Sequence, residues 1–340
     1  MKVERIFAAA TIVVVAGTGH AHASALGPSV TPAQVTTAVN SGVQNQGNVT
    51  SYTTLPTIAS VIRQTFTGTG AAGRADDGGL GIDHRGIAAS ADGALPMQAW
   101  AQGNGGHSQN SLATGGYSLD NYGSQVGFQV EVAPPVVLGI SASWQAMKGK
   151  LNGGFTSNNS TLGLSPYIGW QFDEHWSISA IAGYNSGSTR LNNAAANDSA
   201  RYSGYQWNIL GEIDGSYTVG NFRLSPLFSL AHIETTSDSF TDTLGNRTPR
   251  STTALTRGSL GGSASLPMTG WEPYLRITGE HDFEVPTGSG PNGSSGATIG
   301  GGTTITLTPA MWVTLDGGYY SLGRTGLSLW SASARIDLRF

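Results

Sequence analysis

The C-terminal end of the chain alternates strictly between apolar and polar side chains. The even positions are Trp330, Ala332, Ala334, Ile336, Leu338 and Phe340. The odd positions between them are polar or charged and include Arg335, Asp337 and Arg339. A period of two predicts a β-strand with one apolar and one polar face. A soluble sheet can show this pattern, and so can the last strand of an outer-membrane barrel.

The same alternation recurs from about residue 95 to the C-terminus. At residues 222–230, for example, Phe222, Leu224 and Phe228 share one parity, and arginine and serine occupy positions between them. Scanning by parity predicts twelve strands. They are 96–107, 118–133, 136–148, 161–172, 175–187, 202–218, 221–236, 253–267, 271–284, 297–308, 310–321 and 327–340.

The connections separate a membrane barrel from a soluble β-sandwich. One set is very short: 134–135, 173–174, 219–221, 268–270 and 308–309. The alternate set is longer and polar: 108–117, 149–160, 188–201, 237–252 and 285–296. Short turns on one rim and long loops on the other are typical of outer-membrane barrels. We therefore predict an all-β fold, a 12-stranded antiparallel up-and-down transmembrane β-barrel over residues 95–340.

Side chains near strand ends and on the polar parity give two sets of candidate residues. The predicted interfacial aromatic girdle is Trp100, Trp170, Trp176, Tyr217, Trp271, Trp312 and Tyr319. The predicted lumen-facing charges are Arg223, Arg257, Glu272, Arg276, Glu280, Asp282, Arg335, Asp337 and Arg339, joined by Glu131, Glu212, Asp214 and Asp316. Because unpaired charges are costly at low dielectric, a lattice of mutually paired charges is favoured over a dedicated ligand or ion site.

Composition fits this interpretation. Charged residues make up 11% of the chain, about half of the ~25% typical of soluble domains. The formal net charge of −4 excludes the broad basic surface of a nucleic-acid binder. The absence of cysteine excludes disulfide scaffolds and thiolate metal sites.

The N-terminus predicts export. Lys2 and Arg5 precede an apolar run over residues 6–17, followed by small residues at Ala21 and Ala23. This is the pattern of a secretory signal peptide, and the run is too short for a spanning helix. We predict a signal peptide over residues 1–23 with cleavage after Ala23, and export through the Sec pathway.

The segment between the signal peptide and the barrel is partly helical by sequence. Residues 31–34 read as a helix N-cap with a capping box, and apolar residues follow at helical spacing. A second short helix is predicted from Pro56 to Phe66, and both helices are expected to be weak. The segments are therefore 24–66, with one or two weak helices, and 67–94, a Gly/Asp-rich linker. A plug in the lumen, a periplasmic tail and a surface-exposed peptide all stay open.

Residues 95–340 resemble the translocator β-domain of autotransporters, the type V secretion family. The matching stretches are 100–107 for the opening strand, 122–130 for the second, 224–233 with its Pro226, 272–276 with Pro-Tyr, and 333–340 for the C-terminal assembly signal. The resemblance implies a Gram-negative outer membrane and recognition of the final strand by periplasmic chaperones and the barrel-assembly machinery. Lipid and lipopolysaccharide would surround a monomeric barrel. The family usually carries a long passenger, whereas about seventy residues separate the signal peptide from the first strand here.

Three functions are consistent with the sequence. The first is a translocator that exports or displays a short N-terminal segment, and the second is a structural barrel or small passive pore. The third is an outer-membrane hydrolase, for which the mature chain offers only His84, His107, His175, His232 and His281. No nucleophile elbow or paired-carboxylate motif accompanies them. We therefore expect no catalytic residues, no cofactor, no metal and no nucleic-acid partner.

Overall fold

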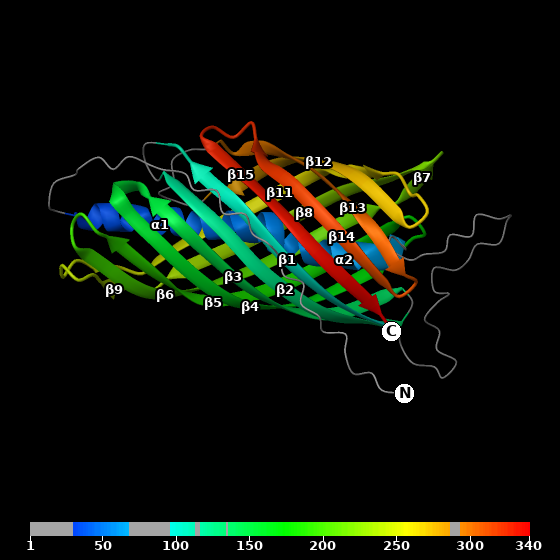
Figure 1. Ribbon diagram of the computed structural model, residues 1–340, viewed down its shortest axis with the longest axis horizontal. Coiled ribbons are helices and arrows are strands. Elements are labelled where there is room, and N and C mark those ends of the chain that lie inside the picture. Colours follow the sequence, from blue (N-terminus) through cyan, green and yellow to red (C-terminus); the bar gives the residue numbers. More distant parts are fainter. Residues whose placement is uncertain (1–29, 68–95, 113–115, 134, 286–292) are drawn as a thin grey trace.

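The computed structural model describes residues 30–67, 96–112, 116–133, 135–285 and 293–340. The predicted signal peptide and almost all of the predicted linker lie outside these residues. The described chain forms a closed antiparallel barrel of twelve long strands around one N-terminal helix (Figure 1). The prediction of a 12-stranded barrel is confirmed.

The long strands follow one another around the barrel in sequence order. They are β1 (Met97–Asn110), β2 (Tyr117–Ala133), β3 (Val136–Leu151), β4 (Phe155–Gln171), β5 (Trp176–Asn193), β6 (Asp198–Gly215), β8 (Phe222–Ser237), β11 (Ser251–Ser265), β12 (Trp271–Glu284), β13 (Ser295–Thr308), β14 (Met311–Leu322) and β15 (Leu327–Arg339). Three short strands are β7 (Tyr217–Val219), β9 (Phe240–Thr241) and β10 (Arg247–Thr248). The first and last long strands pair with each other over residues 98–110 and 327–339, which closes the sheet.

Closure removes every sheet edge, and side-chain parity then separates two surfaces. The outward side chains are apolar and exposed, with Leu162 at 67% and Leu275 at 72% exposure. The inward positions carry mostly Ser, Thr, Asn, Gln and charged residues, which are buried. A barrel with this arrangement satisfies its backbone groups within the sheet and offers an apolar exterior to lipid.

The two rims differ less than the sequence predicts. We call the rim that carries Met97 and Phe340, whose backbones pair, the C-terminal rim. At the opposite rim, the loops predicted at 149–160 and 188–201 are mostly wrong. β3 and β4 are joined by the turn η2 (Asn152–Gly154), and β5 and β6 by residues 194–197. The apolar alternation stops in these stretches because their outward residues are polar, but the backbone pairing continues.

The N-terminal segment, for which the sequence predicts one or two weak helices, forms a single continuous helix. It consists of α1 (Pro32–Val49), the π-helical turn η1 (Thr50–Thr54) and α2 (Leu55–Thr67), 36 residues in all. The predicted capping box is present: the Thr31 hydroxyl accepts from the Gln34 backbone, and the Gln34 side chain accepts from the Thr31 backbone. The π turn precedes Pro56, whose ring disrupts regular α-helical bonding. No helix in the described part of the chain is long and apolar enough to cross a membrane.

Candidate functional site

The helix runs along the barrel interior from one rim to the other (Figure 1). Its first turns pack near Leu151 and Phe155, which flank the β3–β4 turn at the opposite rim. Its last turn reaches the C-terminal rim, where the Thr65 hydroxyl lies 3.3 Å from the Gln98 amide oxygen. At ~1.5 Å per residue a helix of this length spans roughly 54 Å. The helix is therefore long enough to fill the whole lumen.

The apolar face of α2 packs against one side of the barrel wall. Leu55, Ile58, Val61 and Ile62 are almost completely buried. Their partners on the wall include Trp100, Val137, Tyr167, Ile181, Leu210, Ile233 and Leu255. Burying side chains of this size contributes roughly 1.5–3 kcal/mol each.

The contact between α2 and the wall is close enough to require a glycine. A Cβ atom at Gly169 on β4 would lie 2.3 Å from the Ile62 Cγ2 atom and 3.0 Å from the Phe66 ring. A side chain at this position would push the helix away from the wall. Gly169 therefore sets how near α2 can approach β4.

The apolar face of α1 packs against the barrel wall in the same way at the opposite rim. Val35, Ala38, Val39 and Val43 form a second buried cluster with residues of the wall and with the hairpin β9–β10. The wall partners are Tyr117, Leu119, Leu151, Phe155, Leu191, Ala200, Tyr202, Phe240 and Leu327. Both ends of the helix are thus held by apolar contacts.

A buried cluster of charged side chains contacts the helix at its π turn. The Arg257 guanidinium donates to the Asp282 carboxylate at 2.6 and 3.0 Å and lies 4.3 Å from the centre of the Tyr52 ring. The Tyr52 hydroxyl donates to Glu280 at 2.7 Å. Arg324 donates to the same Asp282 at 2.6 Å. Every charge in this cluster has an opposite charge beside it, which offsets the cost of burying it.

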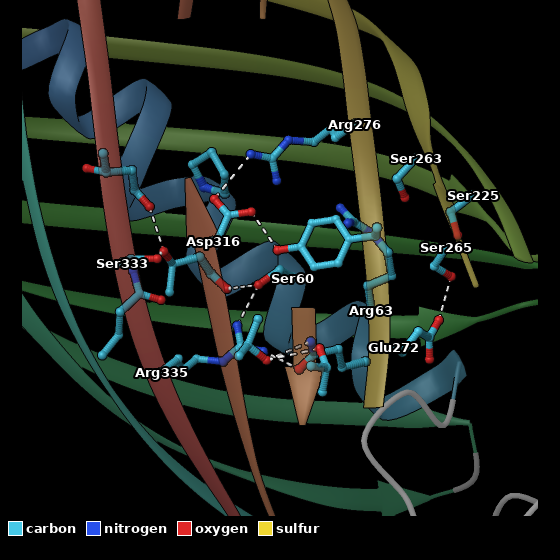
Figure 2. Close-up of a pocket in the computed structure, with 18 of the residues that line it drawn as sticks. Ser60, Arg63, Ser225, Ser263, Ser265, Glu272, Arg276, Asp316, Ser333 and Arg335 are labelled. Atoms are coloured by element: carbon cyan, nitrogen blue, oxygen red, sulfur yellow. Dashed lines mark hydrogen bonds and ion pairs between the residues drawn. The ribbon is translucent and has the colours of Figure 1, made fainter. Parts of the chain in front are cut away.

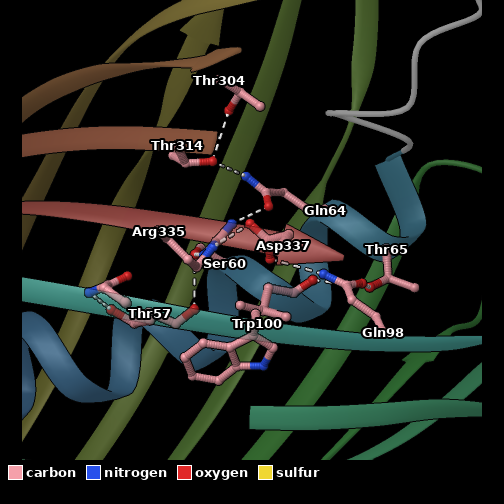
Figure 3. A network of polar contacts seen from close by, with 12 residues as sticks. Thr57, Ser60, Gln64, Thr65, Gln98, Trp100, Thr304, Thr314, Arg335 and Asp337 are labelled. Atoms are coloured by element: carbon pink, nitrogen blue, oxygen red, sulfur yellow. Dashed lines mark hydrogen bonds and ion pairs between the residues drawn. The ribbon is translucent and has the colours of Figure 1, made fainter. Parts of the chain in front are cut away.

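A second polar network joins the helix to β15 and β1 (Figure 3). Arg335 donates to the Ser60 hydroxyl at 2.6 Å and to the Gln64 side chain. Its Nε donates to Asp337 at 2.9 Å, and Asp337 accepts from Gln98 at 3.0 Å. The final strand therefore contacts both the helix and the first strand from its inward face.

One cation on the helix faces two carboxylates on the wall. The Arg63 guanidinium donates to Glu212 at 2.5 Å and lies 3.8 Å from Asp214 on β6. The Asp214 carboxylate also accepts from Ser177 at 3.0 Å. Both carboxylates are nearly inaccessible to solvent, so Arg63 is the cation that offsets the cost of burying them.

A polar cavity of 130 Å³ lies beside the helix on the side away from the apolar contacts (Figure 2). Its wall carries Arg223, paired with Glu272 at 2.9 Å, and Arg276, paired with Asp316 at 3.3 Å. Arg63 and Arg335 of the contacts above also line it. Figure 2 shows Glu272, Arg276, Asp316 and Arg335 of the wall around the space beside Ser60 and Arg63 of the helix.

The structure places the predicted lumen charges on the inward face. Arg257, Glu280, Asp282, Arg335, Asp337, Glu212 and Asp214 are buried, and Arg223, Glu272, Arg276, Asp316, Glu131 and Arg339 are half-buried. Most of them pair with one another or with the helix. The described residues contain no group of His, Cys, Asp and Glu arranged to hold a metal ion. This arrangement favours a lattice of paired charges over an ion site.

The prediction of the aromatic girdle is wrong for two residues. Trp100 and Trp312 are each only 3% exposed and lie inside the barrel. Both pair in register with Asp337, on the inward parity of their strands. Their nearness to a strand end suggested the girdle, but parity decides which face a side chain occupies.

The other girdle residues and the final strand lie on the outer surface. Trp170 and Trp271 are exposed, and Trp176, Tyr217 and Tyr319 are half-buried. Of the predicted assembly signal, Trp330, Ala332, Ile336, Leu338 and Phe340 are exposed and Ala334 is half-buried. The apolar stripe of the last strand thus faces outward.

Three residues that hold the helix are missing from the sequence prediction. Arg63 is the only charged side chain in residues 32–67. A single charge on an otherwise uncharged helix is a sequence signal for a buried partner of opposite charge. Tyr52 lies between the two predicted helices, and Arg324 lies between the predicted strands 310–321 and 327–340. Their partners are distant in sequence, so spacing alone does not reveal them.

The histidines considered for a hydrolase lie near the barrel exterior. The His281 imidazole lies 2.9 Å from the Ser295 hydroxyl, and the His232 imidazole lies 2.7 Å from the Thr256 hydroxyl. Glu284 is 3.9 Å from His232. His84 lies outside the described residues.

Comparison with known proteins identifies the barrel. The family model described as Autotransporter beta-domain matches residues 99–321. The chain is similar to the translocator domain of the autotransporter NalP from Neisseria meningitidis, with 14% identity, a TM-score of 0.62, and coverage of 72% of this chain and 88% of that one. It is also similar to the transport unit of AIDA-I from Escherichia coli, with 17% identity, a TM-score of 0.63, and coverage of 72% and 90%.

A third similar structure is the β-domain of the Bordetella autotransporter BrkA, with 16% identity, a TM-score of 0.59, and coverage of 72% and 99%. No curated protein matches the chain. A barrel of this family lies in the outer membrane of a Gram-negative bacterium and translocates a passenger. The match to the family model and the twelve-stranded fold agree, and the chain belongs to the autotransporter β-domain family.

Proposed function

We propose that the barrel carries its own N-terminal segment outward through the lumen and then retains residues 32–67 as a helix that closes the pore. The observation that supports this most directly is the direction of the helix. Its C-terminal end lies beside the start of β1, and its N-terminal end lies at the opposite rim. With the C-terminal rim facing the periplasm, the residues before Pro32 are displayed at the cell surface.

Display can be tested by cysteine labelling on intact cells, because the chain contains no cysteine. A cysteine replacing Ser29 should react with a membrane-impermeant maleimide without permeabilisation. Leu244→Cys, at an exposed position of the β9–β10 hairpin, serves as the surface control. Asn221→Cys, in the short turn between β7 and β8, serves as the periplasmic control.

Labelling of Ser29→Cys to the same extent as Leu244→Cys supports display. If Ser29→Cys is labelled only after permeabilisation, like Asn221→Cys, the N-terminal end never reaches the surface. A passive barrel with a periplasmic tail would then be the better description.

We also propose that the chain reaches this membrane by Sec-dependent export with cleavage after Ala23. The barrel-assembly machinery and periplasmic chaperones would recognise the outward apolar side chains of β15, which end at Phe340. No catalytic step is part of this proposal, since the paired charges of the lumen serve to hold the helix. A monomeric barrel is sufficient for it, because every strand is paired within one chain.

A further inference from the structure

The exposed cations of the barrel are gathered in one region. Among the described residues, every exposed Lys or Arg falls between positions 148 and 250: Lys148, Lys150, Arg190, Arg201, Arg247 and Arg250. The other described arginines point inside the barrel, where they are buried or half-buried: Arg63, Arg223, Arg257, Arg276, Arg324, Arg335 and Arg339. The outer surface therefore carries a localised positive charge on a chain whose net charge is −4.

Three of these cations lie in one lateral row across four strands. Lys148 pairs in register with Asn158, Asn158 with Arg190, and Arg190 with Arg201. With strands ~4.8 Å apart, the row from β3 to β6 is roughly 14 Å long. Lys150 lies two residues beyond Lys148 on the same face of β3. We call Lys148, Lys150, Arg190 and Arg201 the basic row.

The four strands that carry the basic row have no acidic residue on their outer face. On the flanking strand β2, the exposed Asp120 pairs in register with Lys148, and its carboxylate lies 2.8 Å from the His107 imidazole. In the described parts of β3, β4, β5 and β6, the acidic residues are Asp198, Glu212 and Asp214, and all three are buried on the inward face. Like charges directly opposite each other on neighbouring strands are destabilising. The register pair Arg190 and Arg201 is therefore an arrangement that a bound anion would stabilise.

The height of the basic row matches a lipid headgroup. Trp144 and Tyr205 lie on the same outer face, four residues from Lys148 and Arg201 respectively. Four residues span ~13 Å along a strand, or roughly 10 Å along the membrane normal for a strand tilted by ~40°. Aromatic residues of outer-membrane barrels lie at the membrane interface. The cations are thus just beyond the hydrocarbon core, at the opposite rim.

A groove at the same place provides hydrogen-bond donors. Arg190 and Arg201 line it together with Thr241, Thr243 and Asp242, whose carboxylate accepts from the Leu244 and Asn246 backbones. Arg250 lies 5.6 Å from the centre of the ring of Tyr205, four residues further along β6, and donates to its hydroxyl. Guanidinium groups bind phosphate oxygens in a bidentate manner, and hydroxyl groups add further donors.

We propose that the basic row and this groove bind the phosphorylated glucosamine headgroup of lipopolysaccharide in the outer leaflet. The proposal rests on the orientation given under Proposed function, in which the opposite rim faces outward. The two phosphates of such a headgroup match a row of cations at this height, and acyl chains would follow the apolar surface below Trp144. A soluble phosphate could use the same donors, but it would gain nothing from the apolar surface.

The test is a binding titration of the purified full-length chain in nonionic detergent. Native mass spectrometry would count the bound bisphosphorylated lipid A and give its affinity. The variants are the doubles Arg190→Gln with Arg201→Gln, and Lys148→Gln with Lys150→Gln. About fivefold weaker binding per cation, or roughly 25-fold per double variant, is expected from the attraction of one basic side chain to an anionic surface. Arg247→Gln, in the β9–β10 hairpin outside the row, should bind within about twofold of the wild type.

The controls distinguish phosphate recognition from other causes. The double Arg190→Lys with Arg201→Lys keeps the charge and should retain most of the affinity, whereas lipid A without phosphates should bind the wild type as weakly as the Gln variants bind lipid A. Unchanged affinity in both Gln doubles, or equal binding of dephosphorylated lipid, overturns the proposal. Full competition by millimolar inorganic phosphate would show a free-anion site and would also overturn it. Because the titration uses purified protein, its result is independent of whether Ser29→Cys is labelled on cells.

Discussion

Arg63 is the residue whose replacement should most clearly release the helix from the barrel. It provides the one cation on the helix, and it faces Glu212 at 2.5 Å and Asp214 at 3.8 Å. Arg63→Met keeps a long side chain but leaves two buried carboxylates without the cation that faces them, and Asp214 keeps only its hydrogen bond from Ser177. Removing one member of a buried ion pair costs about 3–5 kcal/mol. Because 20% of the Arg63 side chain is exposed, we take the lower end, about 3 kcal/mol.

This loss of stabilisation shifts the equilibrium between a helix packed in the lumen, which we call seated, and a helix displaced from it, which we call unseated. Since ~1.4 kcal/mol corresponds to a tenfold change, about 3 kcal/mol raises the unseated fraction roughly 100-fold. An empty twelve-stranded barrel has a wider lumen than a packed eight-stranded one. The open fraction of single barrels in a planar bilayer should therefore increase by about two orders of magnitude.

The partner charges provide the rescue and the wall provides the control. Replacing Glu212 with Gln and Asp214 with Asn in the Arg63→Met background removes the unpaired charges and should return the open fraction toward that of the wild type. Arg223→Met makes the same chemical change at a residue whose ion-pair partner, Glu272, belongs to the wall. This control should leave the open fraction unchanged. Equal conductance of Arg63→Met and the wild type would refute the role assigned to this ion pair.

Three other predictions concern separate features of the barrel. Deleting Phe340 should lower the folded fraction in the outer membrane, measured by heat-modifiable gel migration; normal insertion would contradict a signal role. Gly169→Val should unseat the helix at a cost of about 1–3 kcal/mol, the usual range for overpacking. Gly211→Val, where an added Cβ meets nothing within 4 Å, should not change the conductance. In single-tryptophan variants, brominated lipid should quench Trp170 and leave Trp100 unquenched, and quenching of Trp100 would contradict its inward position.

The sequence predicts the strands well where one face meets lipid, and less well beyond that region. The period of two in residues 330–340 is imposed by the difference between lipid and lumen, so it is visible without any structure. The extension of β4 back to Phe155 and of β5 on to Asn193 has no such signal. The outward face is polar there, so the lipid-imposed alternation is missing, and pairing with the neighbouring strand keeps the backbone extended.

The sequence by itself determined the closed barrel, its twelve strands and the inward position of charges such as Arg257, Asp282 and Arg335, because these follow from side-chain parity. Only the tertiary structure decided that residues 32–67 form one helix inside the lumen, and that Trp100 and Trp312 face it. The helix contains few apolar residues and little charge, so its sequence predicts weak local structure. Three of its partners, Arg257, Glu212 and Arg335, are more than 140 residues away along the chain. Barrel closure brings these partners together around the helix, and no periodicity within 32–67 encodes that contact.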